Sequence, residues 1–559
     1  MVQVAFNITE PLTQIELASA VTITKSTLVD YQTKQELNHT CVKSSSSHLI
    51  VKVEKTLKVG EIYTLEFEFN RALGSTEFPG FYHYDYTDRD GKSTSLIATA
   101  LEPILARTVF PCFDDPYMKS VFVVNVIHPK GSQAVSNAEV DKVVKMKDGR
   151  LATQFKTSIK MSTYLCAIAI GDFANATAKT SRGVNIQTLS INENEGFLQE
   201  SADLAAEIVD IMENLTKVQY PLPKLDHLET IRMAGSGIEN FGLIVYDQAV
   251  TSQIDRDVFQ EYEEAKVTAH ETSHQWFGDL VTGKRWGLVY LHESFATFFQ
   301  YEIRRYIPKF EKLYDHFRVS EYSRVVALPT PHPIESDDAV FDPVIYHTGG
   351  MFIQSLKQLL GEEIFYRALN IYLNKFYLGN ADTYDLGLSF EEAGAAPFKG
   401  KNFTTDYIVP YIQKTGLPTV GISELNKKFM VYQENTHSGN IRLVPIHYVN
   451  LDTLEESRID LPNDNPDFIY VFPNNNTYLL NPDQQAFAVI TKDAAVKSRV
   501  ATHKNVPKLS ISRQMTVLVE YVEDNTFFEF ITNIIDYNNG VLPAEFEDVI
   551  TPTIKFQLF

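Results

Sequence analysis

Hydrophobic and polar residues change their spacing along this chain of 559 residues. Over residues 63–69, Tyr, Leu and Phe alternate with Thr and Glu, a period of two that is typical of a half-buried strand. From about residue 200 the period lengthens, and Phe352, Ile353 and Leu356 recur at the spacing of a helix with one buried face. The pattern predicts a β-rich first part and an α-rich middle part.

The last part of the chain returns to short strands and then to helix. Pro445 and a Pro-Asn cluster near Pro473 interrupt short apolar runs between residues 418 and 492, which favours a small β-sandwich. After it, Phe527 and Phe530 begin an apolar repeat with helical spacing. The whole pattern predicts a multidomain α+β protein. Its expected parts are an N-terminal β-rich domain (1–175), an α-rich domain (176–417), a β-sandwich domain (418–492) and a short C-terminal helical region (493–559).

Composition and charge limit the partners of the protein. The chain carries 71 acidic and 50 basic residues, and its formal charge of −21 opposes binding to nucleic acid, so we expect no nucleic-acid partner. No segment reaches the roughly 18 consecutive apolar residues that span a bilayer, so we expect no transmembrane segment in this chain. Six Asn-x-Ser/Thr sequons are typical of a glycoprotein. They begin at Asn7, Asn38, Asn175, Asn214, Asn402 and Asn475.

One short stretch carries the residue types of a zinc site. His270 and His274 stand four residues apart, so on a helix their imidazoles project from one face and can share a tetrahedral metal ion. A catalytic zinc ion keeps one position for water and needs a third protein ligand, which Glu293 offers after 18 intervening residues. Glu271 lies beside the two histidines and can accept a proton from the attacking water. The spacing predicts a zinc hydrolase.

The same spacing predicts how the third ligand reaches the other two. We expect the first helix to continue to about Asp279, the chain to turn near Gly283, and a second helix to bring Glu293 alongside. The alternative is a set of polar residues on a helix surface, but composition seldom produces HExxH with a spaced glutamate in a chain of 14 histidines. We expect His292 to point to another face and to have a structural role.

The sequence around these residues resembles the aminopeptidase N-like family of zinc peptidases, the gluzincin aminopeptidases. The family has the same two histidines, the glutamate between them and the third ligand after the same gap, in a segment like residues 270–299 here. Residues 236–243 (SGIENFGL) are similar to its exopeptidase motif, Gly-Ala-Met-Glu-Asn followed by Trp-Gly-Leu. Residues 346–349 (YHTG) resemble its Tyr-x-Lys-Gly, and residues 106–116 (ARTVFPCFDDP) resemble its Ala-Arg-x-x-Phe-Pro-Cys-Phe-Asp-Glu-Pro.

The resemblance implies a fold and an activity. The α-rich domain is expected to be a thermolysin-like catalytic domain that holds one Zn²⁺ per chain and removes the N-terminal residue from peptides with a free amine. A carboxylate at a fixed distance from zinc can select the protonated amine, whose pKa is near ~8, and the resemblance assigns this task to Glu239 together with Glu102. Gly237 and Asn240 are expected to bind substrate, and Tyr346 to donate a hydrogen bond to the oxyanion.

Several positions near the expected site depart from the family pattern. Ala100 stands where the family usually has Gln, Asp279 replaces Asn, Ser294 replaces Gly, and Thr348 replaces Lys. Such changes alter the hydrogen bonds that orient metal ligands. None of them removes a ligand, the base, the tyrosine or the amine anchor. We therefore expect the chemistry to survive while rate and side-chain preference shift.

The departures and the two ends of the chain leave alternatives open. The start resembles the interior of the family's first domain, and only 67 residues follow Lys492, so we expect a chain truncated at both ends. A catalytically weak or inactive peptide-binding ectodomain is the main alternative to an enzyme, and opening of an epoxide, as in the related leukotriene hydrolase, is a further one. We expect an extracellular or plasma-membrane ectodomain if the N-terminus is incomplete and a cytoplasmic protein otherwise.

Overall fold

The chain forms two compact units in the computed structural model. Within the described residues, no helix is both long enough and apolar enough to cross a membrane. The first unit contains Met1–Asp210, Gln219–Trp286 and Tyr377–Asn380, and the second contains Ile211–Val218, Gly287–Phe376 and Ala381–Phe559. The structure describes residues 1–73, 80–87, 91–191, 195–230, 235–247, 258–338, 341–434, 441–539, 542, 543 and 546.

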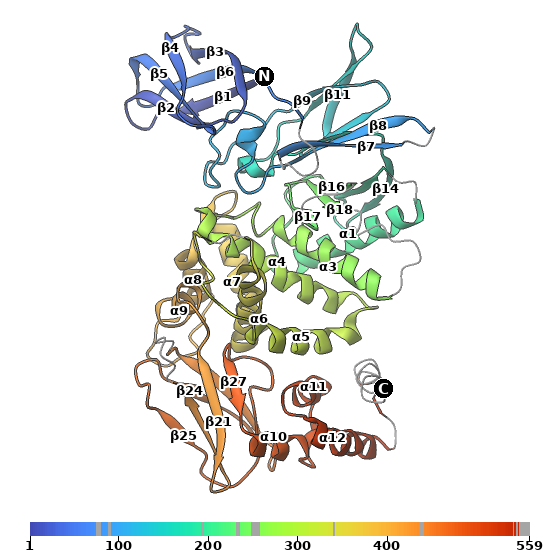
Figure 1. The fold of residues 1–559 in the computed structure, drawn as a ribbon, viewed down its shortest axis with the longest axis vertical. Helices are drawn as coiled ribbons and strands as arrows, with labels where there is room; N and C mark the ends of the chain where they lie inside the picture. Colours follow the sequence, from blue (N-terminus) through green and yellow to red (C-terminus); the bar gives the residue numbers. More distant parts are fainter. Residues whose placement is uncertain are drawn as a thin grey trace. The chain divides into compact units, whose positions relative to one another are not determined.

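Two three-stranded sheets enclose a hydrophobic core at the start of the first unit, drawn in blue in Figure 1. Tyr63, Leu65 and Phe67 on β6 (Ile62–Asn70) are buried in this core, which confirms the alternating strand predicted over residues 63–69. The strand orders are β1–β6–β3 and β2–β5–β4, with β1 at Val2–Asn7, β2 at Leu12–Ala18, β3 at Thr22–Asp30, β4 at His39–Lys43 and β5 at His48–Leu57.

Two further antiparallel sheets follow in the first unit, with the orders β10–β13–β8–β7 and β11–β12–β9. Ala98 of β8 pairs with Ala169 of β13, and both side chains are buried in one hydrophobic cluster. The elements of this part are β7 (Gly80–Thr87), β8 (Ser93–Ala100), η1 (Ala106–Thr108), β9 (Asn125–His128), β10 (Gln133–Ser136), β11 (Val140–Lys145), β12 (Leu151–Phe155), η2 (Thr163–Leu165) and β13 (Ile168–Gly171).

A five-stranded mixed sheet carries the segment that resembles the exopeptidase motif (Figure 1). Its strands β15, β16 and β18 are parallel, and every residue of β16 is buried, as is typical of parallel strands covered on both faces. The short strand β17 pairs with β18 at the edge, and residues 239–242 follow it. The elements are β14 (Ala174–Lys179), β15 (Asn185–Ser190), β16 (Lys224–Thr230), β17 (Gly237–Ile238), β18 (Leu243–Asp247), α1 (Glu195–Thr216) and α3 (Val258–His274).

Helix α3 ends earlier than the ligand spacing predicts. The expected continuation to about Asp279 is wrong, because the helix ends at His274 and the next two N–H groups donate to carbonyls only three residues back. Gly278, with φ of 131°, then changes the chain direction. Gln275, Trp276 and Phe277 are fully buried in the turn that replaces the expected continuation of the helix. Gly283, near which a turn is expected, ends the short strand β19 (Thr282–Gly283), and the chain bends at residues 284 and 285.

Helices dominate the first part of the second unit, as the spacing of its apolar residues predicts. Phe352, Ile353 and Leu356 on α6 (Gly349–Leu360) are fully buried, which confirms the expected helix. Helix α6 packs against α4 (Tyr290–Glu302). The other elements are η3 (Trp286–Leu288), η4 (Ile303–Tyr306), α5 (Glu311–Val326), the π-helical turn η5 (Val344–Thr348), α7 (Glu362–Lys375), β20 (Asn380–Ala381), α8 (Thr383–Glu392), η6 (Thr404–Ile408) and α9 (Val409–Gln413).

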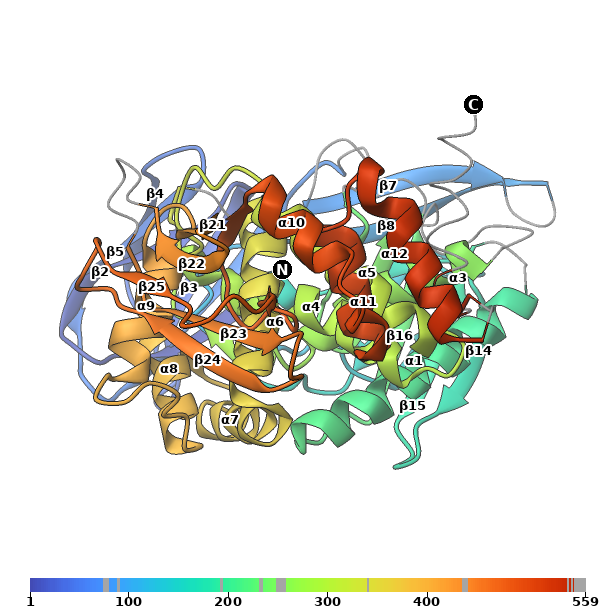
Figure 2. The same ribbon diagram turned by 90° about the horizontal axis from the view of Figure 1, so that it is seen from below.

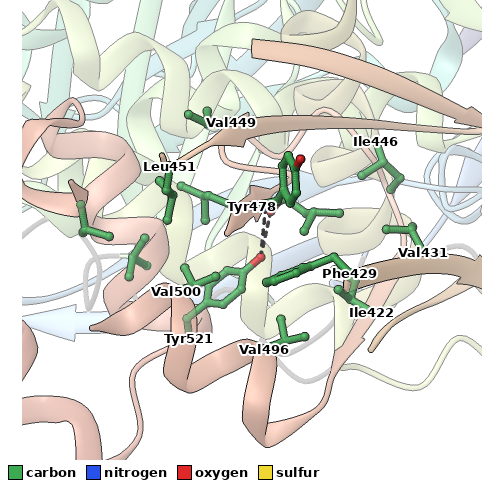
Figure 3. Packing of buried hydrophobic residues seen from close by; sticks show 14 of the residues in the cluster. Ile422, Phe429, Val431, Ile446, Val449, Leu451, Tyr478, Val496, Val500 and Tyr521 are labelled. Atoms are coloured by element: carbon green, nitrogen blue, oxygen red, sulfur yellow. Dashed lines mark hydrogen bonds between the residues drawn. The ribbon is translucent and has the colours of Figure 1, made fainter. Parts of the chain in front are cut away.

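Two sheets in the last part of the second unit share a hydrophobic core (Figure 3). Ile422 and Phe429 of one sheet lie in this core with Ile446 and Val449 of the other. The four domain bounds and the β-sandwich expected from the sequence stay predictions. The strand orders are β25–β22–β21–β27 and β24–β23–β26, with β21 at Thr419–Leu425, β22 at Lys428–Gln433, β23 at Val444–Asn450, β24 at Glu456–Leu461, β25 at Ile469–Val471, β26 at Tyr478–Leu480 and β27 at Val489–Lys492.

Pro445 does not break a strand, contrary to the expectation from its sequence. It lies inside β23, where it pairs with Asp460 of β24. Strand β26 pairs with β23 only from Tyr448 onward, so β24 is the one strand hydrogen-bonded to β23 at Pro445 among the described residues. A proline at such a position does not interrupt a ladder on its other side.

The helices that follow the two sheets appear in red in Figure 2. Phe527 and Phe530 on α12 (Asp524–Tyr537) are buried, which confirms the amphipathic helix expected there. The hydroxyl of Tyr521 donates to the carbonyl oxygen of Leu480 at 3.1 Å and so ties this region to β26. The remaining elements are α10 (Ala494–Ala501), η7 (Val506–Lys508) and α11 (Ile511–Glu520).

Candidate metal centre

The structure brings together the three predicted metal ligands. His270 and His274 lie on α3 with their ring centroids 4.9 Å apart and their planes at 78°. Each histidine and Glu293, in the first turn of α4, offers one donor atom, and these three atoms lie within 4.8 Å of one another. In the part of the chain that the structure describes, no second group of this kind occurs.

A hydrogen bond fixes the tautomer of His274. Its Nδ1 atom lies 3.0 Å from the carbonyl oxygen of Phe277, and because a carbonyl only accepts, Nδ1 must carry the proton. In the neutral ring Nε2 then keeps its lone pair for a metal ion. Two imidazoles and one carboxylate are the ligands that zinc takes at catalytic sites. The residues therefore fit a zinc ion, and the turn after α3 supplies the carbonyl that orients one of them.

Glu271 is buried beside the edge strand β17. Its side chain is 5% exposed, and a Cβ atom on Gly237 would overlap its carboxylate. Glycine at this position thus leaves the space that the carboxylate occupies. This reason for the glycine depends on a contact with α3 that the sequence does not reveal. The substrate-binding role expected of Gly237 stays a prediction.

A glutamine directly after His274 joins α3 to the segment 239–242. The Nε2 atom of Gln275 donates to the carbonyl oxygen of Glu239 at 2.7 Å, and its Oε1 accepts from the N–H of Gly242 at 3.0 Å. The same side chain donates to Asp279 Oδ2 at 3.0 Å and accepts from the hydroxyl of Tyr220 at 3.4 Å. All four hydrogen-bonding positions of this fully buried amide are therefore used.

The segment 239–242 is also held from its other side. Asn137 donates from Nδ2 to the carbonyl oxygen of Phe241 at 2.9 Å. Gly242 has a φ of 82°, and a Cβ atom there would lie 2.5 Å from the carbonyl oxygen of Asn137. Glu239 and Asn240 are 2% and 0% exposed within this fixed segment. Their expected roles, amine anchor and substrate contact, stay predictions.

Burial and charge act together on Asp279, one of the departures from the family pattern. Burial raises the pKa of Asp279 well above its ordinary value, and the Glu239 and Glu271 carboxylates raise it further, while His274 and Lys119 lower it. The Lys119 ammonium donates to the carbonyl oxygens of Asp279 at 3.0 Å and Leu280 at 3.2 Å. The raised pKa of Asp279 opposes the negative charge that this departure from asparagine would add to the site.

Tyr346 lies in the middle of the π-helical turn η5 in the second unit. The Oδ1 atom of Asp342 accepts from the N–H groups of Val344 at 2.9 Å and Ile345 at 3.2 Å, and so caps the start of this turn. Single π-helical turns often occur at functional sites. Glu102 follows β8 in the first unit and is partly buried. The expected roles of Tyr346 and Glu102 stay predictions.

Two family models match the sequence. Residues 1–165 match the peptidase M1 N-terminal domain, and residues 200–407 match the peptidase family M1 domain. The second match contains the three candidate ligands, Glu271 and Tyr346. The chain belongs to peptidase family M1. The β-rich N-terminal part and the helical part with the ligands agree in outline with the two M1 domains, as the sequence predicts.

Relatives of this M1 chain carry the names of aminopeptidases. The puromycin-sensitive aminopeptidase of Caenorhabditis elegans is 32% identical over 395 residues, which cover 67% of this chain and 40% of the relative. The alanine/arginine aminopeptidase of Saccharomyces cerevisiae is 28% identical over 545 residues, 89% of this chain and 62% of the relative. Aminopeptidase N of Haemonchus contortus is 28% identical over 476 residues, 78% of this chain and 48% of the relative. The chain spans about half the length of the curated relatives it matches.

Proposed function

We propose that this chain is a zinc aminopeptidase that hydrolyses the N-terminal residue from peptides with a free amine. The observation that carries the proposal is the grouping of His270, His274 and Glu293, with the proton of His274 held on Nδ1. Membership of family M1 and the aminopeptidase relatives support it. One zinc ion per chain would polarise the scissile carbonyl and lower the pKa of a water molecule.

Glu271 acts as the general base in this proposal. Its carboxylate takes a proton from the attacking water and passes it to the leaving amine. General acid–base catalysis of this kind raises the rate by ~10²- to 10⁴-fold. Two features support the assignment: Glu271 directly follows the ligand His270 on α3, and the missing Cβ of Gly237 makes room for its carboxylate. The base is therefore held in place by the edge strand.

Glu239 and Glu102 bind the protonated amine of the peptide, with Gly237 and Asn240 as further substrate contacts. An exopeptidase must keep this anchor at a fixed distance from the reacting carbonyl, since only then is the first peptide bond selected. The hydrogen bonds from Gln275 to both ends of the segment 239–242 supply such a constraint. The raised pKa of Asp279 opposes a further negative charge beside the two anchor carboxylates and Glu271.

Tyr346 donates a hydrogen bond from its hydroxyl to the oxyanion that forms when water adds to the carbonyl. Donors of this kind raise kcat by ~10²- to 10³-fold, because they stabilise negative charge that develops only in the transition state. The capped π-helical turn that carries Tyr346 supports this role, because a fixed backbone keeps the hydroxyl in one orientation.

The proposal is tested with the purified chain loaded with zinc. We expect it to cleave aminoacyl reporters with a free amine and to leave the N-acetylated forms of the same reporters intact. The Glu271→Gln variant should bind zinc equally and lose turnover. Equal, negligible turnover by the wild type and this variant at full zinc loading would overturn the proposal, and peptide binding without turnover would then point to a binding protein.

A further inference from the structure

We infer that Ser294 positions the oxyanion-binding tyrosine by holding the π-helical turn that carries it. This inference rests on the role proposed above for Tyr346. Ser294 directly follows the ligand Glu293 on α4, and its Oγ donates to the carbonyl oxygen of Ile345 at 2.7 Å. Both partners of this bond are buried, and Ile345 is the neighbour of Tyr346 in the chain.

The π-helical turn explains why the carbonyl of Ile345 accepts this hydrogen bond. In a regular α-helix the N–H of Gly349 donates to the carbonyl four residues back, which belongs to Ile345. Here the N–H of Gly349 donates instead to the carbonyls of Val344 and Tyr346. The hydroxyl of Ser294 thus supplies a donor to a carbonyl whose regular helical partner has moved away.

Close contact between α4 and α6 makes the bond possible. A Cβ atom on Gly349 would overlap the hydroxyl of Ser294, and one on Gly350 would lie 2.8 Å from Thr297 Cγ2. The two helices therefore meet through a serine, a threonine and two glycines.

The bond connects two parts of the proposed catalytic machinery within the second unit. Asp342 fixes the start of the turn, and Ser294 fixes its middle, on either side of the backbone that leads to Tyr346. A hydrogen bond from Tyr346 to the oxyanion exists only in the transition state. Loosening the turn should therefore lower kcat and leave KM nearly unchanged.

Hydrogen exchange tests the anchor without any activity measurement. In the zinc-loaded full chain, Ser294→Ala should increase exchange of the amides in residues 344–350 roughly three- to tenfold, since it removes one buried hydrogen bond. Thr297→Val is the matched control, because Thr297 Oγ1 is a buried hydroxyl on the same helix that has no hydrogen-bond partner among the described residues. Equal exchange in the wild type and Ser294→Ala would overturn the inference.

Steady-state kinetics test whether Ser294 acts through Tyr346. They compare the wild type, Ser294→Ala, Tyr346→Phe and the double variant. Ser294→Ala should lower kcat roughly three- to tenfold with KM within about twofold, and it should change kcat less than about twofold in a Tyr346→Phe background. An equal loss in both backgrounds would show a general structural role and overturn the positioning role. If the wild type shows no turnover at all, the proposed function and the positioning role fail together, and the exchange experiment alone decides whether Ser294 anchors the turn.

Discussion

Replacing Gln275 by methionine tests how the amine anchor is held. Methionine has nearly the length and volume of glutamine, but it makes no strong hydrogen bond. The variant would remove the hydrogen bond from Gln275 Nε2 to the carbonyl oxygen of Glu239 (2.7 Å). It would also remove the one from the N–H of Gly242 to Gln275 Oε1 (3.0 Å). Both groups are buried, so water cannot easily replace the lost amide.

The size of the effect follows from these two bonds. Each is worth about 1 kcal/mol net, so the segment 239–242 should lose roughly 2 kcal/mol of the free energy that holds it against α3. This corresponds to about a 30-fold change in an equilibrium constant. Because apparent affinity falls with the fraction of molecules that keep the anchor in place, KM for free-amine substrates should rise by up to about 30-fold.

Steady-state kinetics with aminoacyl reporters, together with zinc analysis, check this prediction. We expect zinc content to stay the same, because the ligands His270 and His274 are unchanged. Gln354→Met is the matched control, since Gln354 is also a buried glutamine and its Nε2 has no hydrogen-bond partner among the described residues. A KM within twofold of wild type, or an equal rise in the control, would refute the reasoning about Gln275.

Three further predictions concern the base, the helix contact and pH. Glu271→Gln should lower kcat by ~10²- to 10⁴-fold at unchanged zinc content, because an amide cannot take up the proton. Gly349→Ala should destabilise the protein by about 1–3 kcal/mol, because its Cβ overlaps Ser294, and the double variant with Ser294→Gly should recover most of the melting temperature. Burial lowers the pKa of His227 from 6.5 to about 3, so the unfolded chain binds one proton more than the folded chain between these values. Stability should therefore fall as pH drops through that window, and His227→Gln should flatten the decrease in melting temperature.

Each of these predictions has an outcome that contradicts it. A kcat of Glu271→Gln close to that of the wild type at equal zinc content would show that Glu271 is not the general base. Gly349→Ala as stable as the wild type would contradict the close approach of α4 and α6. An unchanged pH dependence in His227→Gln would show that other groups cause the acid sensitivity of the fold.

The metal ligands were predictable because their arrangement depends mainly on local geometry. His270 and His274 are one helical turn apart, and a helix places such residues on one face whatever the rest of the fold does. The same holds for Phe352, Ile353 and Leu356, whose spacing predicts the buried face of α6. The end of α3 was not predictable from spacing. It depends on the tertiary contacts of the buried residues that follow His274.

The residues that the sequence did not reveal act through hydrogen bonds to the backbone of distant segments. Gln275 bonds to groups 36 and 33 positions away, and Ser294 to a carbonyl 51 positions away. Every residue offers a carbonyl, so such an acceptor leaves no mark in the sequence.

The same contacts change how the departures from the family pattern are judged. Asp279 accepts a hydrogen bond from Gln275, and its burial raises the pKa of its carboxyl, which opposes a negative charge where the family has asparagine. Ser294 adds a bond where the family has a glycine, and Gly349 leaves the space for it. These two substitutions therefore each have a neighbour that accommodates them, Gln275 for Asp279 and Gly349 for Ser294. The catalytic cost of these two departures should therefore be small, and a rate close to that of the aminopeptidase relatives would agree with this view.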